Sequence, residues 1–326
     1  MELILASPTG KELRNLLYSE CDFEVGELEN SFQVKIKRPE WEGMDSGSRI
    51  YIPGTEYGGL FRQISTDTEE GTISPGGITW RGMMQKKIIV PPSGSDYATD
   101  SGELNAIIKA RVEAAFPNLF IGSTDSTGVT VTWQYSRYCT LEQGLKDMLA
   151  SKGYRLNIEY SQTDKAVKVS AVPIVNYSSD VQFSADWRLN YYMRMQSDGV
   201  NHLICLGKGE LQNRTVINLY ADASGNISQT PTYTGINEVA EVYDYPGAED
   251  DDLLETGTEH FKDLLNNNLF EIRLDESQEL AIGDIVGGKD YLSGLTMSAP
   301  VTGKIVHWQR GRKTIEYQLS DNVSLA

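Results

Sequence analysis

Histidines and glycine-lysine pairs are the first side chains in this sequence that could bind metals or phosphates. The three histidines, His202, His260 and His307, lie far apart, and none belongs to an HExxH motif or to a Cys/His pair at zinc-binding spacing. No Gly-Lys pair is followed by the Ser or Thr of a phosphate-binding loop, and the GxSxG motif of serine hydrolases is missing. Packing or surface roles are therefore favoured for the histidines, and we expect no cofactor and no metal.

Carboxylates are the second group with possible catalytic or metal-binding roles. The densest run lies at residues 249–252 and is followed by Glu255; these side chains could act as an acid, a base or Ca²⁺ ligands. The run lacks the glycine of an EF-hand loop, so a solvated helix start, where the helix dipole favours negative charge, is preferred. Glycosidase carboxylates are recognised by their separation in space. A peptidoglycan- or glycan-active enzyme with unmarked carboxylates therefore stays open, as does a binding module for host glycan.

Two segments that combine tryptophan, arginine and methionine are the least ordinary features. Residues 79–87 and 186–195 each place a Trp-Arg pair beside methionine and further cations. Interface cores are enriched in these types, because they bury a large area and keep a polar group. Stacking on nucleic acid would use the same types, but 29 Lys and Arg against 46 Asp and Glu give a net charge of −17, which disfavours binding to phosphate. The candidate core or interface anchors are Trp80, Arg81, Trp187 and Arg188.

The first region that positions these side chains is predicted to be β-rich. The chain has 326 residues, which exceeds one ordinary domain. Residues 1–95 contain short runs of alternating apolar and polar residues between turn signals, as in Phe32 to Lys37, and this is typical of a small β-barrel or sandwich. Two consecutive prolines, Pro91 and Pro92, remove backbone donors, and we place a domain boundary there.

The second region, residues 96–175, changes to helical spacing. Asp100 and Glu103 have the spacing of a capping box ahead of a helix that runs to Pro117. A second helix is expected to begin at Thr140. With short strands between and after these helices, the region is predicted to be a small α/β module.

The third region, residues 176–326, returns to a β pattern. One helix near 250–266 interrupts it, with the acidic run at its start and apolar residues such as Phe261 on its buried face. The region ends in a hairpin, whose strands lie at 303–308 and 313–319. The fold class expected from the whole chain is β-rich α+β, in the order β, α/β, β.

The cysteines and the apolar segments indicate the cellular compartment in which the chain is made. Cys21, Cys139 and Cys205 are an odd number without CxxC spacing, so they are interpreted as buried thiols in a reducing compartment. The N-terminus has no basic leader, and no segment approaches the roughly 18 apolar residues of a membrane helix. We therefore expect synthesis in the cytoplasm and no membrane insertion.

Seven short segments form an ordered pattern along the chain. They are FEVGELENSF at 23–32, GTEYGG at 54–59, TWRGM at 79–83, KKIIVPP at 86–92, RYCTL at 137–141, GDIVG at 283–287 and VTGKI at 301–305. Together these segments resemble the tail-tip, or baseplate, hub proteins of siphophages and prophages. The resemblance runs in order through most of the chain and does not rest on one motif.

The resemblance implies a fold and a function. The expected fold has two pseudo-equivalent small β-barrel domains, at residues 1–95 and 176–326, with the α/β module of residues 96–175 inserted. The expected function is structural and not enzymatic: a homotrimeric adaptor that joins the six-fold tail tube to three-fold tip structures and forms a channel for DNA passage. Because the chain ends soon after its last hairpin, we expect no lytic or receptor-binding extension.

The same resemblance implies partners and a location. The expected partners are distal tail and tail tube proteins, the tape measure protein and tip or receptor-binding proteins, and the location is the virion. We expect no sequence-specific contact with nucleic acid. The excess of acidic groups should line the channel or the outer faces, because an anionic bore repels DNA and lets it slide.

Overall fold

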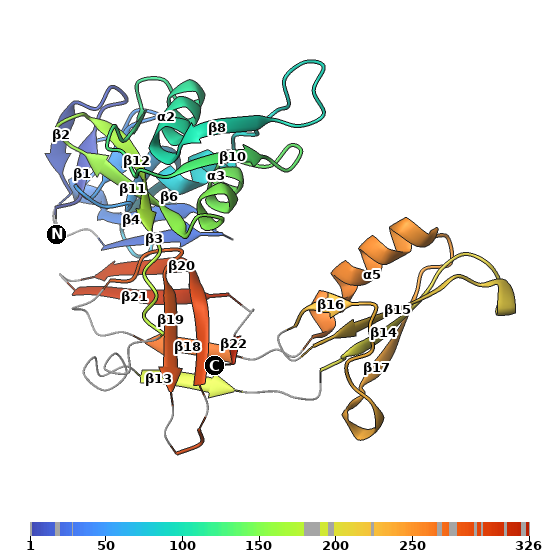
Figure 1. The fold of residues 1–326 in the computed structure, drawn as a ribbon. Helices are drawn as coiled ribbons and strands as arrows, with labels where there is room; N and C mark the ends of the chain where they lie inside the picture. The colour runs from blue at the N-terminus through green and yellow to red at the C-terminus, as the bar shows by residue number, and fades with distance from the viewer. Residues whose placement is uncertain are drawn as a thin grey trace. The chain divides into compact units, whose positions relative to one another are not determined.

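The chain folds into two compact units. The computed structural model (Figure 1) describes residues 2–16, 20–27, 29–178, 190–194, 199–222, 225–265, 269–273, 279–289, 292–294, 296–309, 312–320 and 324–325. Unit 1 comprises Met1–Asn190, Ile272–Val286 and Pro300–Leu319, and unit 2 comprises Tyr191–Glu271, Gly287–Ala299 and Ser320–Ala326. The C-terminal part of the chain therefore returns twice to unit 1.

A largely antiparallel sheet is the main element of unit 1 (Figure 1). Most of its strands come from the first 79 residues: β1 (Ile4–Ala6), β2 (Glu12–Asn15), β3 (Glu20–Gly26), β4 (Ser31–Lys37), β5 (Arg49–Tyr51), β6 (Gly58–Asp67) and β7 (Thr72–Thr79). A single 3-10 turn, η1 (Arg38–Glu40), follows β4. The alternation predicted for β4 is confirmed, because Phe32, Val34 and Ile36 are buried while the residues between them are more exposed.

The C-terminal hairpin completes this sheet. β20 (Thr296–Gln309) pairs with β21 (Arg312–Leu319) and, along residues 303–308, with β3. β19 (Ile285–Lys289) also pairs with β20, and both strands contribute residues to each unit. The sequence predicted a domain boundary near residue 176. This boundary does not separate the C-terminal strands from the sheet of residues 1–95, because backbone hydrogen bonds join β3 to β20.

The strand order in unit 1 is β20-β3-β4-β7-β6-β5-β1-β2. Among the strands that the structure describes, no pairing joins the two ends of this series into a closed barrel. The observed fold class is therefore β-rich α+β with several sheets, as predicted at that level. The two closed, pseudo-equivalent barrels stay a prediction.

A short helix that sequence reasoning missed follows β7 directly. α1 (Trp80–Gln85) begins after Thr79, whose Oγ1 accepts a hydrogen bond from the amide of Gly82 at 3.2 Å. This side chain is a regular N-cap. Six residues are fewer than two helical turns, so the helix has no apolar repeat that a sequence pattern would reveal.

Residues 96–175, which belong to unit 1, contain both helices and strands. Their elements are β8 (Thr99–Glu103), α2 (Leu104–Ala115), β9 (Phe120–Gly122), β10 (Thr130–Gln134), α3 (Leu141–Ala150), β11 (Tyr154–Ser161) and β12 (Ala166–Pro173). Thr140 caps α3 as predicted, since its Oγ1 accepts from the amide of Gln143 at 3.1 Å. The cap of α2 is Glu103 and not Asp100, because Asp100 lies in β8, where its carboxylate binds Arg111.

The module and the large sheet share one hydrophobic core. Buried residues of the sheet and of α1, such as Ile4 and Trp80, belong to the same cluster as Leu145 of α3 and Tyr160 of β11. The rings of Tyr51 and Tyr160 lie 3.8 Å apart between centroids, and the rings of Trp80 and Tyr160 lie 5.6 Å apart. Burial of such large aromatic surfaces is the main favourable term that holds the module on the sheet.

Unit 2 contains a four-stranded sheet covered by one helix (Figure 1). Its elements are β13 (Asn190–Arg194), β14 (His202–Leu206), η2 (Leu211–Asn213), β15 (Val216–Ala221), β16 (Ile227–Ser228), η3 (Gly235–Asn237), β17 (Ala240–Asp244), α5 (Asp250–Leu264), β18 (Leu269–Arg273) and β22 (Ser324–Leu325). The sheet order is β16-β15-β14-β17, and β13 pairs with β18.

The helix predicted near 250–266 is confirmed as α5. Leu253 and Phe261 face the sheet and pack with Leu203, Cys205 and other buried residues. None of the helices in the described ranges is long and apolar enough to cross a membrane.

Candidate functional site

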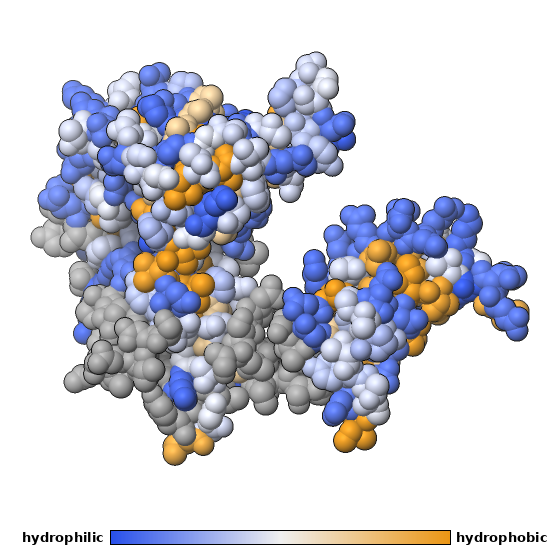
Figure 2. Space-filling view, viewed as in Figure 1, coloured by the Kyte–Doolittle hydropathy of each residue, from blue (hydrophilic) through white to orange (hydrophobic). Residues whose placement is uncertain are grey.

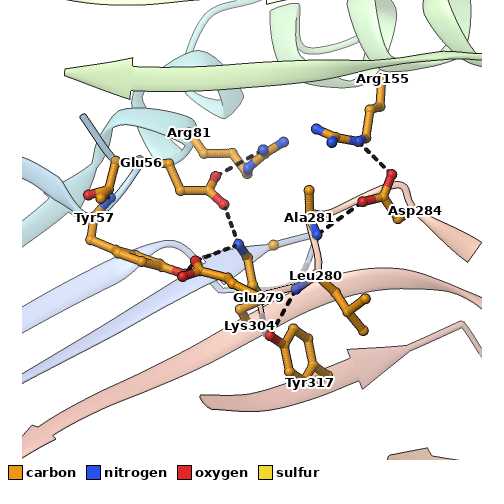
Figure 3. Close-up of polar contacts among 12 residues, drawn as sticks. Glu56, Tyr57, Arg81, Arg155, Glu279, Leu280, Ala281, Asp284, Lys304 and Tyr317 are labelled. Carbon is orange, nitrogen blue, oxygen red and sulfur yellow. Dashed lines mark hydrogen bonds and ion pairs between the residues drawn. The ribbon is translucent and has the colours of Figure 1, made fainter. Parts of the chain in front are cut away.

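The most unusual polar feature of unit 1 is a buried carboxylate that binds two cations (Figure 3). Glu56 lies in the turn between β5 and β6, and its side chain is 12% exposed. Its Oε2 lies 3.0 Å from Nη2 of Arg81, and its Oε1 lies 3.0 Å from Nζ of Lys304. Burial by itself would raise the pKa of Glu56, but Lys304 and Arg81 outweigh it and lower this pKa to about 2.

Arg81 extends the network to the α/β module. It is the second residue of α1, and its Nη1 lies 3.1 Å from Oε1 of Glu142 on α3. Both side chains are nearly inaccessible to water, at 4% and 3% exposure. Burial disfavours the charged guanidinium, yet Glu56 and Glu142 outweigh this and raise the pKa of Arg81. Arg81 is thus a buried cation that contacts the carboxyl groups of Glu56 and Glu142.

Lys304 extends the network to the C-terminal hairpin. It lies on β20, and its ammonium contacts Glu279 at 3.4 Å in addition to Glu56. Glu279 also binds Lys313 of β21 and accepts a hydrogen bond from the hydroxyl of Tyr57. The ammonium of Lys304 lies 5.3 Å from the centroid of the Tyr57 ring, which adds a cation–π contact.

The titration of the outer part of this network follows from the same contacts. Burial, together with Glu279 and Glu56, raises the pKa of Tyr57, so its hydroxyl keeps its proton as a donor. Burial would raise the pKa of Glu279, but Lys304 and Lys313 lower it below the ordinary value. Glu279 is therefore charged and the hydroxyl of Tyr57 protonated across the neutral pH range.

A second buried ion pair holds the segment that carries Glu279 (Figure 3). Nε of Arg155, on β11, lies 2.7 Å from Oδ1 of Asp284, whose side chain is 2% exposed. The other oxygen of Asp284 accepts from the amide of Ala281 at 3.2 Å. Tyr317 accepts from the amide of Leu280 at 3.1 Å. Residues 279–284 are thereby attached to both the module and the hairpin.

The carboxylates of this network are paired with cations. Glu56, Glu142 and Asp284 each accept a hydrogen bond from a charged side chain. A general acid requires a carboxyl whose pKa is raised, whereas the pKa of Glu56 is lowered. Within the ranges that the structure describes, no three His, Cys, Asp or Glu side chains gather where they could hold a metal ion. We therefore describe the site as a buried ionic network that joins three distant segments of the chain.

Two of the four predicted anchors belong to this site. Trp80 is fully buried and Arg81 is 3% exposed. A Cβ on Gly58 would lie 2.6 Å from Nε1 of Trp80, so only glycine allows the indole to approach the backbone this closely. Trp187 and Arg188 lie outside the described residues.

Sequence reasoning missed the partners of Arg81. Glu56, Glu142 and Lys304 come from a turn, a helix and a strand with no common motif. The only local signal is the position of each charge among apolar neighbours, and that signal does not identify which charges pair.

The other candidate residues have ordinary structural surroundings. His202 stacks on Tyr220, and its ring nitrogens contact Glu238 at 2.6 Å and Asn218 at 2.9 Å. His260 stacks on a tyrosine, and His307 contacts an exposed aspartate.

The acidic run is exposed at the start of α5. Its Glu249 lies 2.8 Å from Lys208 in an ion pair with both side chains largely in water. This agrees with the interpretation as a solvated helix start.

Comparison with known proteins identifies the fold. No protein-family profile and no curated protein sequence matches the chain. The structure is similar to that of a 43 kDa tail protein of prophage MuSo2 from Shewanella oneidensis, at 11% identity and a TM-score of 0.51, covering 99% of both chains. It also matches tail proteins from Neisseria meningitidis MC58 and a Listeria monocytogenes EGD-e prophage, each at 14% identity and a TM-score of 0.48, covering 98% of this chain and 95% and 94% of theirs. The chain thus shares its fold with the prophage tail protein of Shewanella oneidensis.

Proposed function

We propose that this chain is a structural hub of the tail tip, or baseplate, of a phage or a phage-derived particle. The observation that carries the proposal is the similarity to the prophage tail protein of Shewanella oneidensis, which extends over 99% of both chains. Function is not transferred by fold alone. The ordered resemblance of the sequence segments to tail-tip hubs supports the same conclusion independently.

The proposed assembly is a homotrimer whose two β-rich regions, at 1–95 and 176–326, act as like domains around a channel. Closed cyclic rings are the usual form of homo-oligomers. One feature of unit 1 supports assembly through the sheet. β5 pairs with only the first three residues of β6, and residues 62–67 at the outer end of β6 are exposed. An unpaired strand edge of this kind is available for pairing with another chain.

Charge supports the proposed passage of DNA. Three copies carry a formal charge of −51, three times the −17 of one chain. An anionic bore would not retain a polyanion, and screening limits the repulsion to about 8 Å at physiological salt. The proposed partners are tail tube, distal tail, tape measure and tip proteins, and the proposed location is the virion.

The buried ionic network would serve this role as a static clamp. Glu56, Arg81, Lys304 and their partners attach the hairpin and the module to the sheet, so that unit 1 resists deformation as one body. The lowered pKa values of Glu56 and Glu279 make these two side chains poor candidates for glycoside hydrolysis, which needs one carboxyl with a raised pKa. We therefore propose that the chain is not an enzyme.

The decisive experiment compares phage particles made with and without the chain. Particles assembled without it should have tails without tips, and a chain with a small C-terminal tag should restore them and carry the label at the tail end in electron micrographs. Complete tails without the chain, or a label absent from the particles, would overturn the proposal. Incubation of the purified chain with peptidoglycan should release no product.

A further inference from the structure

An exposed apolar surface lies where the segment after α1 meets the start of α3. The amide of Ile89 donates to the carbonyl of Cys139 at 2.9 Å, and the amide of Leu141 donates to the carbonyl of Lys87 at 2.7 Å. Ile88 faces Thr140 in this antiparallel bridge. Side chains alternate along such a pair, so Ile89 enters the core while its neighbours point outward.

Three apolar side chains beside this bridge are exposed. Ile88, Val90 and Tyr138 are 50%, 58% and 54% exposed. Ile88 and Val90 lie on one segment and Tyr138 on the other, each within two residues of the bridge between Ile88 and Thr140. Tyr138 has a φ of 58°, a left-handed conformation that is uncommon for a bulky residue. The chain therefore accepts backbone strain at a position where the ring is presented to solvent.

Cations surround this surface, although the chain as a whole is acidic. Lys86, Lys87 and Arg137 are exposed, and none forms an ion pair with a carboxylate in the part of the chain that the structure describes. The guanidinium of Arg137 lies 5.4 Å from the centroid of the Tyr138 ring. We call the exposed residues Lys86, Lys87, Ile88, Val90, Arg137 and Tyr138 the basic apolar patch.

A surface with the opposite charge lies on α5. Its outer side carries exposed carboxylates, with Asp251, Glu255 and Glu259 four residues apart and therefore in one row. None of the three forms an ion pair within the described ranges. Leu254 is half-buried beside them. Figure 2 shows hydrophilic residues along the outer side of α5 and apolar residues between the helix and the sheet of unit 2.

We propose that the basic apolar patch of one copy docks onto the outer side of α5 of a second copy. Lys87 and Arg137 would face the carboxylate row, and Val90 and Tyr138 would pack against the helix beside Leu254. The two surfaces differ, so the contact is head-to-tail, and such contacts generate closed rings when the rotation permits. The inference rests on the self-association proposed above and adds a second contact to the strand edge of β6 named there.

Charge reversal on the full-length chain tests this contact. The variant Lys87→Glu/Arg137→Glu should weaken self-association in sedimentation velocity by about tenfold or more, because like charges then face each other. A mixture of this variant with Asp251→Lys/Glu255→Lys should associate more tightly than either variant alone, as pairs or short chains, because a ring of three would leave one contact between like charges. The matched control Lys37→Glu/Lys152→Glu changes the net charge equally at exposed lysines outside the patch and should associate like the unmodified chain.

A second variant tests the apolar part without changing charge. Val90→Ser should weaken association at both low and high salt, and circular dichroism checks that each variant keeps its fold. The inference is overturned if the unmodified chain is monomeric, if the reversed patch associates normally, or if the mixture associates no more tightly than either variant alone. If the charge-reversed patch variant lost binding to duplex DNA but self-associated normally, the inference would also be overturned. The patch would then be interpreted as a phosphate-binding surface. The tail-tip proposal is judged separately, by whether tips form without the chain.

Discussion

The charged side chains of the buried ionic network differ in solvent exposure, and this difference should determine how much each contributes to the free energy of unfolding. Lys304→Met leaves the buried Glu56 with one cation, and we expect a loss of about 3–5 kcal/mol in the free energy of unfolding. Lys313→Met removes a more exposed cation from Glu279 and should cost about 0–1 kcal/mol. Urea unfolding of both variants gives the comparison. Equal losses would contradict the difference in burial.

The low pKa of Glu56 predicts a dependence of stability on acid. Its pKa is about 2 in the folded chain, against 4.5 ordinarily, so the unfolded state binds more protons between these values and stability falls as pH falls. The loss should amount to roughly 3 kcal/mol between pH 5 and pH 2. Unfolding free energies measured across this range should show a shallower decline for Glu56→Gln than for the unmodified chain. Parallel curves would exclude Glu56 as the titrating group.

Trp80 provides a test between core and interface roles. The sequence alone allowed it to anchor a subunit contact, in which case Trp80→Ala would impair tip assembly and leave the monomer folded. Its indole is fully buried within unit 1, so we expect a loss of about 3–5 kcal/mol in the stability of the monomer. Chemical unfolding of the monomer measures this. An unchanged unfolding curve together with failed tail incorporation would favour the interface role.

At the scale of elements, the contact between α5 and its sheet depends on one glycine. A Cβ on Gly257 would lie 2.6 Å from Sγ of Cys205. Gly257→Ala should therefore destabilise unit 2 by about 1–3 kcal/mol through overpacking, although alanine is the better helix former. Adding Cys205→Ala should restore part of the loss. Thermal unfolding of the variants measures these changes in stability. A Gly257→Ala variant that is more stable than the unmodified chain would show that the helix can move away from Cys205 without loss of stability.

At the scale of the whole molecule, each unit contains a hydrophobic cluster among the residues that the structure describes. Chains that contain more than one compact unit often unfold in more than one step. We expect two transitions in scanning calorimetry. Lys304→Met should shift the midpoint of one transition, and Gly257→Ala should shift the midpoint of the other. A single transition that both variants shift equally would mean that the units unfold together.

The sequence by itself determined the elements whose signals are local. Thr140 with Gln143, the alternation in β4 and the acidic start of α5 all act within a few residues, and the structure contains each element as predicted. The phage-tail resemblance likewise came from ordered segments, and the fold agrees with it. These features could be predicted from the sequence because capping, periodicity and helix dipoles are properties of short stretches of backbone.

Only the tertiary structure decided which distant residues meet. β20 pairs with β3, and this register brings Lys304 to Glu56 and closes the ionic network. Nothing in either segment specifies the other, because a strand edge accepts any backbone and a carboxylate accepts any cation. Which strands and charges pair is determined by the packing of the complete core. The observed strand register buries the apolar side chains and pairs the charges that lose contact with water, and this arrangement has the lowest free energy.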